Sequence, residues 1–469
     1  MIGVSADSMN AGRVILRNLV EGGGVPRERI WAVHPRAAQI DGCRCVASPS
    51  DLPEPVDMAV VSVPAGQGAE VVGELVTSRR ARSVTLIPGG FAETEKGRAI
   101  ETRLRRLIDD AHRSEDGGVL VNGGNCLGII SVPGRYSTFF IPPYKLPLLD
   151  APGRNVASLS QSGAYLVTQI SNLAGVLRPR YAVSFGNQID LTLSDYLEYL
   201  ESDPEVAVFS VYLEGFQRGD GARFVACARR LRAKGRPVVF YKAGRSPEGG
   251  AAAASHTAAA VGDYDVCREL IESAGVVDCA SLDEFEDLTQ VFSLLAGRAV
   301  TGPRVAVLSN AGFEATAAAD NLAGLRLADL TPETRTQLAR LLPPGVVDVH
   351  NPLDTTPLMP TDRYVECARA MAEDPGVDVV LVAGVPATPF LDNLPRGEGH
   401  SEDIEGAFSV PSRLVELFRA AAKPMVFSVD SGGLYDAGVL RMRRAGLPCY
   451  RRIDRAIRAL AAFVRWHRA

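Results

Sequence analysis

The sequence of 469 residues lacks long apolar runs and any excess of basic residues. No stretch reaches the 18 or more consecutive apolar residues of a membrane-spanning helix. The N-terminus has neither the basic region nor the apolar run of a secretory signal peptide. The net charge of −5 argues against a nucleic-acid binder, which usually presents a basic face. These absences favour a globular protein of the cytoplasm.

Metal and nucleotide motifs are also missing. The eight cysteines are scattered, and Cys43 and Cys45 lie too close together for a metal-binding pair of the usual two-residue spacing. No second pair follows, so we expect reduced thiols and no metal site. No GxxxxGK[ST] phosphate loop occurs. With only six histidines in the chain, a histidine in an unusual context stands out.

What is present is the composition of an ordinary globular protein, with 46% hydrophobic and 22% charged residues. The length suggests about three domains at ~150 residues each. Short apolar, β-branched runs alternate with amphipathic segments such as residues 95–112, which predicts right-handed strand–helix–strand units around parallel sheets. The runs that we expect as strands are residues 58–63, 83–87, 118–121, 156–160, 181–185, 206–213, 237–241, 304–309, 377–383 and 424–429.

This alternation predicts an α/β fold of three consecutive domains. The first covers residues 1–130, a connector rich in proline, glycine and aromatic residues covers 131–155, and the other two domains cover 156–300 and 301–469. Each strand ends in a turn of small residues. Ligands of such sheets bind outside the carboxyl ends of the strands, so these turns are the candidate ligand loops.

Positive charge gathers in two short runs, residues 103–106 and 229–232. Such runs on amphipathic segments are typical of solvated helix faces. Binding of a small anionic ligand is the less favoured alternative.

The segment GRSPEGGAAAASHT at residues 244–257 is the most informative part of the chain. His256 ends a run of small residues and lies between Ser255 and Thr257. Such a segment can pack tightly against other backbone, or it can move. Imidazole is nucleophilic near neutral pH, so a histidine that carries a phosphoryl group between two sites would fit here. Taken alone, the segment favours the alternative of a small-residue loop or helix start with an incidental histidine.

A turn after the strand at 156–160 has the pattern of an anion site. Ser160-Gln-Ser-Gly-Ala164 ends a strand and opens a helix. The N–H groups of Ser162, Gly163 and Ala164 and the helix dipole would favour a phosphate, which a glycine lets approach closely. An N-cap formed by serine is an equally favoured alternative.

Two further positions carry candidate chemistry. Glu214 ends the strand at 206–213, where a carboxylate could accept the Nδ1–H of an imidazole and leave Nε2 free to attack. A charge that leaves the sheet into solvent is the more common explanation of a single glutamate. The turn from Gly3 through Ser5 to Gly12 is a loose glycine-rich strand-to-helix turn, after a strand of only two or three residues. It suggests a nucleotide-like ligand only weakly.

Taken together and in order, these motifs resemble the α-type subunit of the NDP-forming acyl-CoA synthetases. This superfamily includes succinyl-CoA synthetase, and the ADP-forming acetyl-CoA synthetase branch is the closer match. The resemblance covers nearly the whole chain, and the ordered set is specific enough to overturn the incidental interpretation of His256. The matching pieces are His34-Pro-Arg36, Val63-Pro-Ala65, Gly90-Phe91, Gly123, Asn125-Cys-Leu-Gly128, Ser160-Gln-Ser-Gly-Ala164, Ser184-Phe-Gly-Asn187, Asp190, Tyr199-Leu200, Asp203-Pro204, Tyr212-Leu-Glu214, Lys242-Ala-Gly-Arg-Ser246, Ser255-His-Thr257, Gly262, Ala274-Gly-Val276, Ser309-Asn-Ala-Gly312 and Asn351-Pro-Leu-Asp354.

The resemblance implies a Rossmann-like domain that binds coenzyme A, followed by two flavodoxin-like domains. It implies that acyl-CoA and phosphate give an acyl phosphate, that His256 then takes the phosphoryl group, and that the Gly/Ala run lets this segment swing to an ATP-grasp domain where ADP becomes ATP. Glu214 would orient His256, and Ser162, Gly163 and Ala164 would hold phosphate. The residues implied in coenzyme A binding are Gly3, Ser5, Arg36, Val63, Pro64, Gly90, Asn125 and Cys126.

The chain departs from the family pattern at three places. Ala258 stands where glycine is usual, Gly124 stands where proline is common, and the first strand is short. Nothing is left of the chain to form an ATP-grasp domain. The resemblance therefore implies a separate β-type subunit that binds ATP or ADP with Mg²⁺, in an α2β2-like assembly with no nucleic-acid or membrane partner. The alternatives are an acyl- or carbamoyl-transferase of the same architecture and a non-catalytic regulatory protein that binds coenzyme A.

Overall fold

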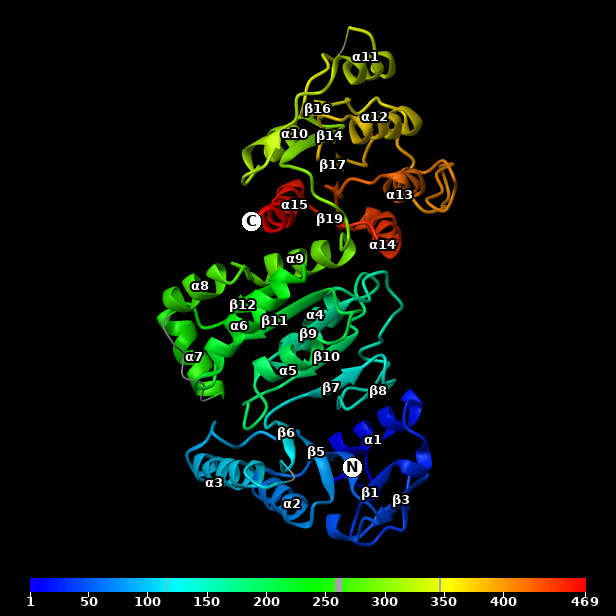
Figure 1. Ribbon diagram of the computed structural model, residues 1–469. Helices are drawn as coiled ribbons and strands as arrows, with labels where there is room; N and C mark the ends of the chain where they lie inside the picture. The colour runs from blue at the N-terminus through cyan, green and yellow to red at the C-terminus, as the bar shows by residue number, and fades with distance from the viewer. Residues whose placement is uncertain (116, 258–263, 346) are drawn as a thin grey trace. The chain divides into compact units, whose positions relative to one another are not determined.

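The computed structural model describes residues 1–115, 117–257, 264–345 and 347–469 (Figure 1), and the side chains of residues 254–257 lie outside this description. The chain forms two compact units. One comprises residues 1–149, 155–174 and 179–279, and the other comprises residues 150–154, 175–178 and 280–469. In the described part of the chain, no helix is both long enough and apolar enough to cross a membrane.

The first unit begins with a small parallel sheet flanked by helices. Its strands are paired in the order β4-β5-β6, and a three-stranded group pairs in the order β1-β3-β2. The predicted short first strand is reduced to Ile2, which forms single bridges to Val33 and Val61. The bounds are β1 (Trp31–Val33), β2 (Gln39–Ile40), β3 (Cys43–Val46), β4 (Val56–Val61), β5 (Ala81–Leu86), β6 (Leu120–Gly123), α1 (Ala11–Gly22), α2 (Ala65–Ser78) and α3 (Glu95–His112).

Sequence determines the start and the buried face of these helices. Asn10 caps α1, because its side chain accepts a hydrogen bond from the N–H of Arg13 at 2.9 Å. Ile15, Leu16 and Leu19 repeat at helical spacing and are buried. Thr94 caps α3 in the same way, through the N–H of Gly97.

A seven-stranded sheet forms the rest of the first unit, in the order β13-β12-β11-β9-β10-β7-β8. Its first five strands pair in parallel, whereas β7 and β8 are antiparallel additions at the edge. Fully buried Phe209, Phe224 and Phe240 form part of its core. The bounds are β7 (Gly128–Ser131), β8 (Tyr136–Ser137), β9 (Val156–Ser160), β10 (Tyr181–Ser184), β11 (Val208–Leu213), β12 (Val238–Lys242), β13 (Val277–Asp278), α4 (Gly163–Asn172), α5 (Leu193–Leu200), α6 (Asp220–Ala233), α7 (Pro247–Thr257) and α8 (Tyr264–Ser273).

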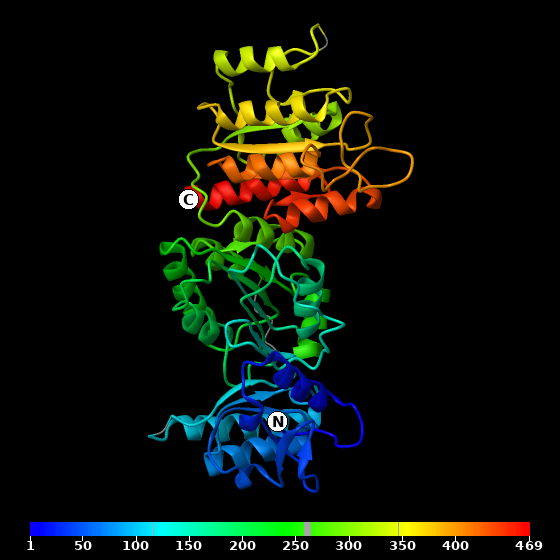
Figure 2. The same cartoon turned by 90° about the vertical axis from the view of Figure 1, so that its right-hand side faces the viewer.

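The second unit is a parallel sheet with helices on both faces (Figures 1 and 2). The strand order is β15-β14-β17-β18-β19, with β16 also paired to β14. Helices α10 and α15 pack together on one face, and α12, α13 and α14 pack in a row on the other. The bounds are β14 (Arg304–Ser309), β15 (Arg326–Leu327), β16 (Leu353–Asp354), β17 (Val379–Gly384), β18 (Met425–Val429), β19 (Cys449–Tyr450), α9 (Leu282–Leu294), α10 (Gly312–Asp320), α11 (Pro332–Leu341), α12 (Thr361–Glu373), α13 (Val410–Ala420), α14 (Asp436–Arg444) and α15 (Ile453–Arg468).

The predicted α/β class with parallel sheets is confirmed. The predicted domain boundaries at residues 130, 155 and 300 stay predictions. Strand β7 lies across the first of them, β8 lies in the predicted connector, and both join the seven-stranded sheet. Helix α9, just before the last boundary, packs on α15, where the rings of Phe292 and Phe463 lie 5.4 Å apart.

Candidate functional site

The predicted phosphate turn lies at the carboxyl end of β9, where α4 begins. Ser162 is the N-cap of α4, because its Oγ accepts the N–H of Tyr165 at 3.3 Å. Ser160 donates its hydroxyl to the carbonyl oxygen of Ser162 at 2.7 Å. The N-cap alternative is therefore present, and it leaves the N–H groups of Gly163 and Ala164 in the first turn, where a helix favours an anion.

Gly163 is needed at this turn for space. A Cβ at this position would lie 2.8 Å from Cβ of Leu127 and 3.3 Å from Oγ of Ser184. Ser184 is itself fixed, since its Oγ accepts the N–H of Leu127 at 3.0 Å. The turn after β6 and the turn after β9 are therefore in direct contact.

Glu214 lies next to the phosphate turn, directly after β11. The Oε1 of Gln161 accepts the N–H groups of Glu214 at 2.9 Å and of Gly215 at 3.1 Å. Gln161 is 2% exposed, and its Nε2 has no hydrogen-bond partner among the described residues. The structure thus brings together two predicted groups, the phosphate turn and the carboxylate, through a glutamine that sequence reasoning did not single out.

Aromatic rings surround this end of β11. Tyr212 stacks on Tyr165 with ring centroids 4.7 Å apart, and on Tyr241 with centroids 5.6 Å apart. Burial and the nearby carboxylate of Glu214 raise the pKa of the Tyr212 hydroxyl well above its usual range. The surroundings of Glu214 are therefore partly apolar, where electrostatic interactions are stronger than in water.

The segment that leads to His256 begins at the carboxyl end of β12. Arg245 donates from Nε to the carbonyl of Lys242 at 2.7 Å, and its guanidinium lies 4.4 Å from the ring centroid of Tyr241 and 5.3 Å from that of Tyr264. These contacts fix the start of α7, whose last turn includes His256. The side chain of His256 and the whole of Ala258 lie outside the described residues.

Several residues implied in coenzyme A binding meet at the carboxyl edge of the first sheet. A Cβ on Gly3, whose φ is +92°, would lie 2.3 Å from the carbonyl oxygen of Ser62 and 2.9 Å from a methyl group of Val63. A Cβ on Gly12 would lie 2.3 Å from the carbonyl oxygen of Gly3. Because Gly3 and Gly12 have no side chains, the residue after β4, the turn at Gly3 and the start of α1 can pack together this closely. A turn of this kind can lie close to a phosphate.

The remaining predicted positions lie on neighbouring turns of this edge. Pro64 precedes α2, and Gly90 has a φ of +98° and approaches Ala65. Ser5 is hydrogen-bonded within its own turn, through Ser8. Arg36 follows β1 and is exposed. The guanidinium of an exposed arginine can pair with a phosphate group.

Asn125 and Cys126 lie in the turn after β6. Asn125 has a φ of +51° and donates its N–H to the carbonyl of Pro88 at 2.8 Å. Cys126 is 4% exposed and donates its thiol to the carbonyl of Leu86 at 3.3 Å. Burial raises the pKa of the Cys126 thiol to about 12, so this thiol stays protonated and takes no part as a nucleophile. The peptide bond between Gly123 and Gly124 is cis.

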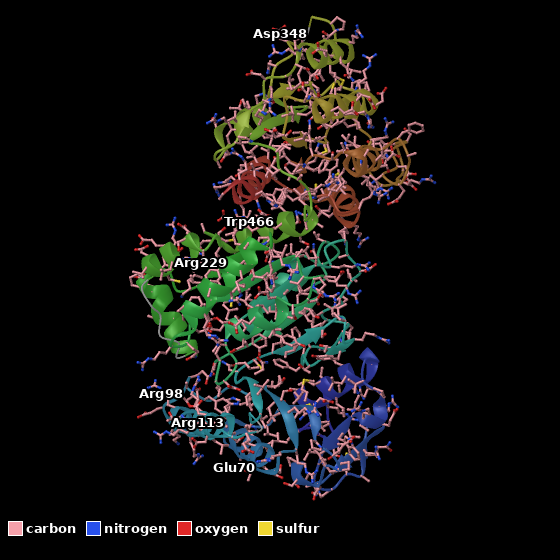
Figure 3. All side chains as sticks on the ribbon, in the orientation of Figure 1. Glu70, Arg98, Arg113, Arg229, Asp348 and Trp466 are labelled. Atoms are coloured by element: carbon pink, nitrogen blue, oxygen red, sulfur yellow. The ribbon has the colours of Figure 1, made fainter. Side chains whose placement is uncertain are left out.

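Each of the two basic runs combines exposed arginines with a half-buried one, Arg105 in the first and Arg232 in the second. Arg229 is exposed and points outward from α6 (Figure 3), as expected of a solvated helix face. The expectation is wrong for Arg105, which pairs with Glu101 at 2.8 Å and donates to the carbonyl oxygens of Gln188 at 3.0 Å and Ile189 at 2.6 Å. Gln188 and Ile189 lie 83 and 84 residues after Arg105, so the local sequence pattern gave no sign of these hydrogen bonds.

Arg105 supports a loop that carries a further polar pair. Asn187 in this loop is 2% exposed, and its Nδ2 donates to Oε1 of Glu93 at 2.9 Å. Its N–H donates to the carbonyl of Gly124 at 2.8 Å. The loop therefore connects the turns after β5, β6 and β10. Sequence reasoning used Asn187 as part of a motif and missed Glu93.

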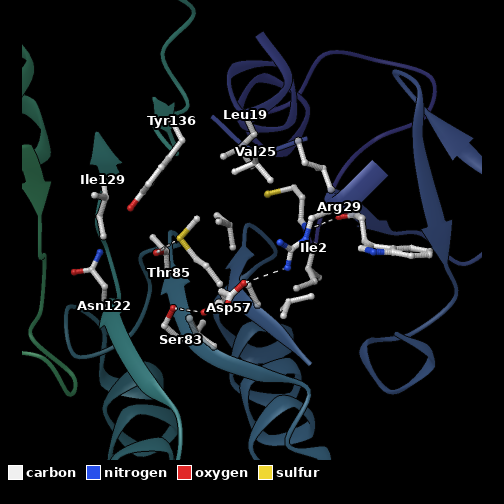
Figure 4. Close-up of a pocket in the computed structure, with 18 of the residues that line it drawn as sticks. Ile2, Leu19, Val25, Arg29, Asp57, Ser83, Thr85, Asn122, Ile129 and Tyr136 are labelled. Carbon is white, nitrogen blue, oxygen red and sulfur yellow. Dashed lines mark hydrogen bonds and ion pairs between the residues drawn. The ribbon is translucent and has the colours of Figure 1, made fainter. Parts of the chain in front are cut away.

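A cavity of about 520 Å³ lies elsewhere in the first unit. Figure 4 shows that apolar side chains such as Ile2, Leu19 and Val25 line it, together with Thr85, Asn122 and Tyr136. None of the residues predicted for catalysis, phosphate or coenzyme A is among the described residues that line it. Ligands of parallel sheets bind at the carboxyl ends of the strands, so we place the candidate site at the turns and not in this cavity.

The chain matches two known families, each over one part of its length. Residues 1–131 match a family described as CoA binding domain, and residues 153–292 match one described as succinyl-CoA ligase like flavodoxin domain. In the described part of the chain, no group of three or more His, Cys, Asp or Glu side chains could hold a metal ion.

Similar proteins extend these matches over the whole chain. The acetate–CoA ligase [ADP-forming] II subunit alpha of Pyrococcus furiosus is 29% identical, over 99% of this chain and 95% of that protein. The acetate–CoA ligase [ADP-forming] I of Archaeoglobus fulgidus is 31% identical, over 99% of this chain but only 62% of that protein. The chain thus spans nearly all of the alpha-subunit relative and less than two thirds of this longer relative.

A solved structure has the same fold. The dinucleotide forming acetyl-coenzyme A synthetase 1 of Ca. Korarchaeum cryptofilum, in complex with phosphate and ADP, superposes with a TM-score of 0.86 at 27% identity, over 100% of this chain and 94% of that one. The ordered motifs, the parallel sheets and these similarities agree with one another. Over nearly its whole length, the chain is similar to the α-type chains of the NDP-forming acyl-CoA synthetases.

Proposed function

We propose that this chain is the α-type subunit of an NDP-forming acid–CoA ligase that converts acyl-CoA, phosphate and ADP into a carboxylic acid, coenzyme A and ATP. The reaction would pass through an acyl phosphate and a phosphohistidine at His256. The observation that carries this proposal is the contact between the phosphate turn and Glu214, made by the two hydrogen bonds to Gln161.

The proposed chemistry follows from these positions. Glu214 would accept the Nδ1–H of the His256 imidazole, so that Nε2 carries a lone pair. Nε2 forms a bond to phosphorus of the acyl phosphate, the bond from phosphorus to the acyl oxygen breaks, and the carboxylate leaves. The N–H groups of Gly163 and Ala164 stabilise the negative oxygens of the phosphoryl group during this step.

Coenzyme A would bind at the carboxyl edge of the first sheet. Gly3 and Gly12 allow the backbone of this turn to pack closely against Ser62 and α1, and a glycine-rich turn before a helix N-terminus fits a phosphate group of the ligand. Arg36, Val63, Pro64 and Gly90 lie on the turns beside it. Bound coenzyme A supplies the thiol that carries the acyl group, and phosphate displaces this thiol from the acyl carbon.

A separate ATP-grasp subunit would supply the nucleotide site and its Mg²⁺. The longer Archaeoglobus relative carries the ADP-forming activity on a chain of which this one covers 62%. The Pyrococcus relative is named as a subunit alpha and is covered to 95%. Both facts support a β-type partner, and we propose an α2β2-like assembly.

The substitution Glu214→Gln tests this proposal. An amide cannot carry the charge that stabilises the imidazolium-like state, so phosphohistidine formation should slow by roughly 100-fold, the lower end of general acid–base effects. Coenzyme A binding, measured by calorimetry, should stay unchanged because Glu214 is not among the residues proposed to bind coenzyme A. An unchanged rate of phosphorylation would contradict the assigned role and favour a transferase or regulatory protein of the same architecture.

A further inference from the structure

Lys242, the last residue of β12, is a buried cation beside the proposed site. Its side chain is 2% exposed. Its Nζ donates two hydrogen bonds of 2.6 Å each, to the carbonyl oxygens of Glu214 and Ala243. A buried ammonium is costly unless it is hydrogen-bonded or paired with a charge, so a lysine at this position calls for a reason.

The bond from Lys242 to the carbonyl oxygen of Glu214 completes a clamp around the main chain of this glutamate. Gln161 holds the N–H of Glu214 from the side of β9, and Lys242 holds its carbonyl oxygen from the side of β12. Both contacts act where the chain leaves the sheet, because Leu213 is still paired with Lys242 in the parallel ladder. The direction in which the Glu214 side chain leaves the sheet is therefore fixed from two sides.

The ammonium also interacts with the charge of Glu214. Burial lowers the pKa of Lys242, while the Glu214 carboxylate and the Cys267 thiol on α8 act in the opposite direction. The other charged or titratable groups nearby are the guanidinium of Arg245 and the hydroxyls of Tyr212 and Tyr241. A positive charge beside a carboxylate favours its ionised form.

Lys242 also lies at the base of the segment that carries His256. Its carbonyl oxygen accepts the Nε–H of Arg245, which fixes the start of α7. One residue thus touches the Glu214 main chain through its side chain and the histidine segment through its main chain.

We propose that Lys242 is a positioning residue for Glu214, which fixes the main chain of this glutamate and supplies the positive charge that keeps its carboxylate ionised to accept the imidazole N–H. The proposal rests on the proposed role of Glu214 in phosphohistidine formation. It goes further by naming a buried cation that acts through the main chain and the charge of Glu214.

The test is a pair of substitutions in the full chain, Lys242→Gln and Lys242→Met. Glutamine keeps amide donors but removes the charge, and methionine removes both. Phosphorylation of the protein is measured as a function of pH, with labelled phosphate and a panel of acyl-CoAs. Lys423→Met is the matched control, because Lys423 in the second unit is half-buried and also donates to a main-chain carbonyl, that of Asp374.

We expect Lys242→Gln to move the acid limb of the pH profile to higher pH by about one unit, because loss of a nearby positive charge raises the pKa of a carboxylate. Lys242→Met should also lower the maximal rate by at least ~10-fold, since the clamp on Glu214 is lost. Coenzyme A binding and the Lys423→Met profile should match the wild type. If Lys242→Met does not fold, Lys242→Gln decides the question alone.

A double-substitution cycle shows whether Lys242 acts through Glu214. In the Glu214→Gln background, Lys242→Gln should cause no further shift, because the carboxylate on which it acts is gone. A full additional shift there, or a wild-type profile for Lys242→Gln alone, would overturn the proposal. A wild-type chain that is not phosphorylated at all would instead refute the proposed function, so the two failures are distinguishable.

Discussion

Gly163 shows how a single missing side chain shapes the phosphate turn. The turns after β6 and β9 approach each other so closely that Leu127 and Ser184 leave no room for a Cβ. The sequence pattern favoured glycine there because a phosphate could approach, and the structure adds a packing reason that acts in the absence of any ligand.

The substitution Gly163→Ala should therefore reduce both stability and phosphorylation. Its Cβ must displace Leu127 or the main chain of α4, which we expect to lower the free energy of unfolding by about 1–3 kcal/mol. Urea denaturation measures this loss. Gly66→Ala is the control: a Cβ at this exposed position of α2 meets nothing within 4 Å, so it should leave stability unchanged or raise it by up to about 1 kcal/mol. Equal stability of the two variants would contradict the packing argument.

Glu314 is a second residue whose environment decides its behaviour. It is fully buried in α10, its Oε2 accepts the hydroxyl of Ser309, and its Oε1 has no hydrogen-bond partner among the described residues. Burial is the main cause that raises the pKa of the Glu314 carboxyl to about 8, and the charges of Asp430 and Asp354 add to it. The carboxyl is thus protonated in the folded protein at neutral pH.

This carboxyl predicts a defined pH dependence of stability. Between its ordinary pKa of 4.5 and the folded value of about 8, the folded state holds one proton more than the unfolded state. The contribution of Glu314 to the free energy of unfolding is therefore greatest at low pH and falls as the pH rises through this window. Glu314→Gln should remove that slope, whereas Glu333→Gln, on the exposed side of α11, should keep it. Parallel slopes for wild type and Glu314→Gln in urea denaturation at several pH values would show that the carboxyl is ionised in the fold.

At the scale of elements, the long apolar runs are predicted well. The strands expected at 156–160 and 304–309 coincide with β9 and β14, and the expected helix at 95–112 coincides with α3. Hydrophobic periodicity and caps act locally, so they can be read from one sequence. The edge strands β7 and β8 were not predicted, because Tyr136–Ser137 is too short to show alternation and lies among turn residues.

The candidate site divides in the same way. Glu214, Ser162 and Gly163 could be proposed from sequence because each ends a strand or begins a helix. Gln161, Lys242 and Glu93 could not, because their roles depend on partners 53, 28 and 94 residues away. For Lys242, the one sequence signal was a charged residue at the end of an apolar run. That pattern normally indicates a strand that ends in solvent.

Helix α7 gives the prediction at this scale. Arg245 fixes its start through stacking on Tyr241 and Tyr264 and through a hydrogen bond to Cys279. Lysine has no planar group to stack on the two rings. It also lacks the forked donors with which Arg245 bonds the carbonyl oxygens of Lys242 and Cys279 at once. Arg245→Lys should therefore slow phosphorylation of His256 by roughly 3- to 10-fold, equivalent to about 1 kcal/mol. Single-turnover labelling measures the rate.

The matched control for α7 is Arg268→Lys. Arg268 is exposed on α8 and pairs with Glu272 at 2.8 Å, a type of ion pair that contributes little. The rate of His256 phosphorylation in Arg268→Lys should equal that of the wild type. If Arg245→Lys and Arg268→Lys phosphorylate equally fast, the start of α7 does not control the histidine segment.

At the scale of the whole molecule, the chain holds part of a reaction cycle. Its turns supply the proposed sites for coenzyme A, phosphate and the phosphoryl carrier, while the nucleotide is assigned to a partner. When the purified chain alone is given acyl-CoA and inorganic phosphate, the phosphoryl group derived from the inorganic phosphate should therefore reach His256. Phosphate from ATP should reach it only after an ATP-grasp subunit is added.

The most direct measurement is acid-labile phosphate on the purified chain, wild type beside His256→Ala. Each protein is incubated with labelled phosphate and a panel of acyl-CoAs, and separately with labelled ATP and an ATP-grasp partner, and the label is located by mass spectrometry. The account predicts an acid-labile phosphate at His256 in the wild type and none in His256→Ala. No label under any of these conditions, or equal labelling of the variant, would contradict it.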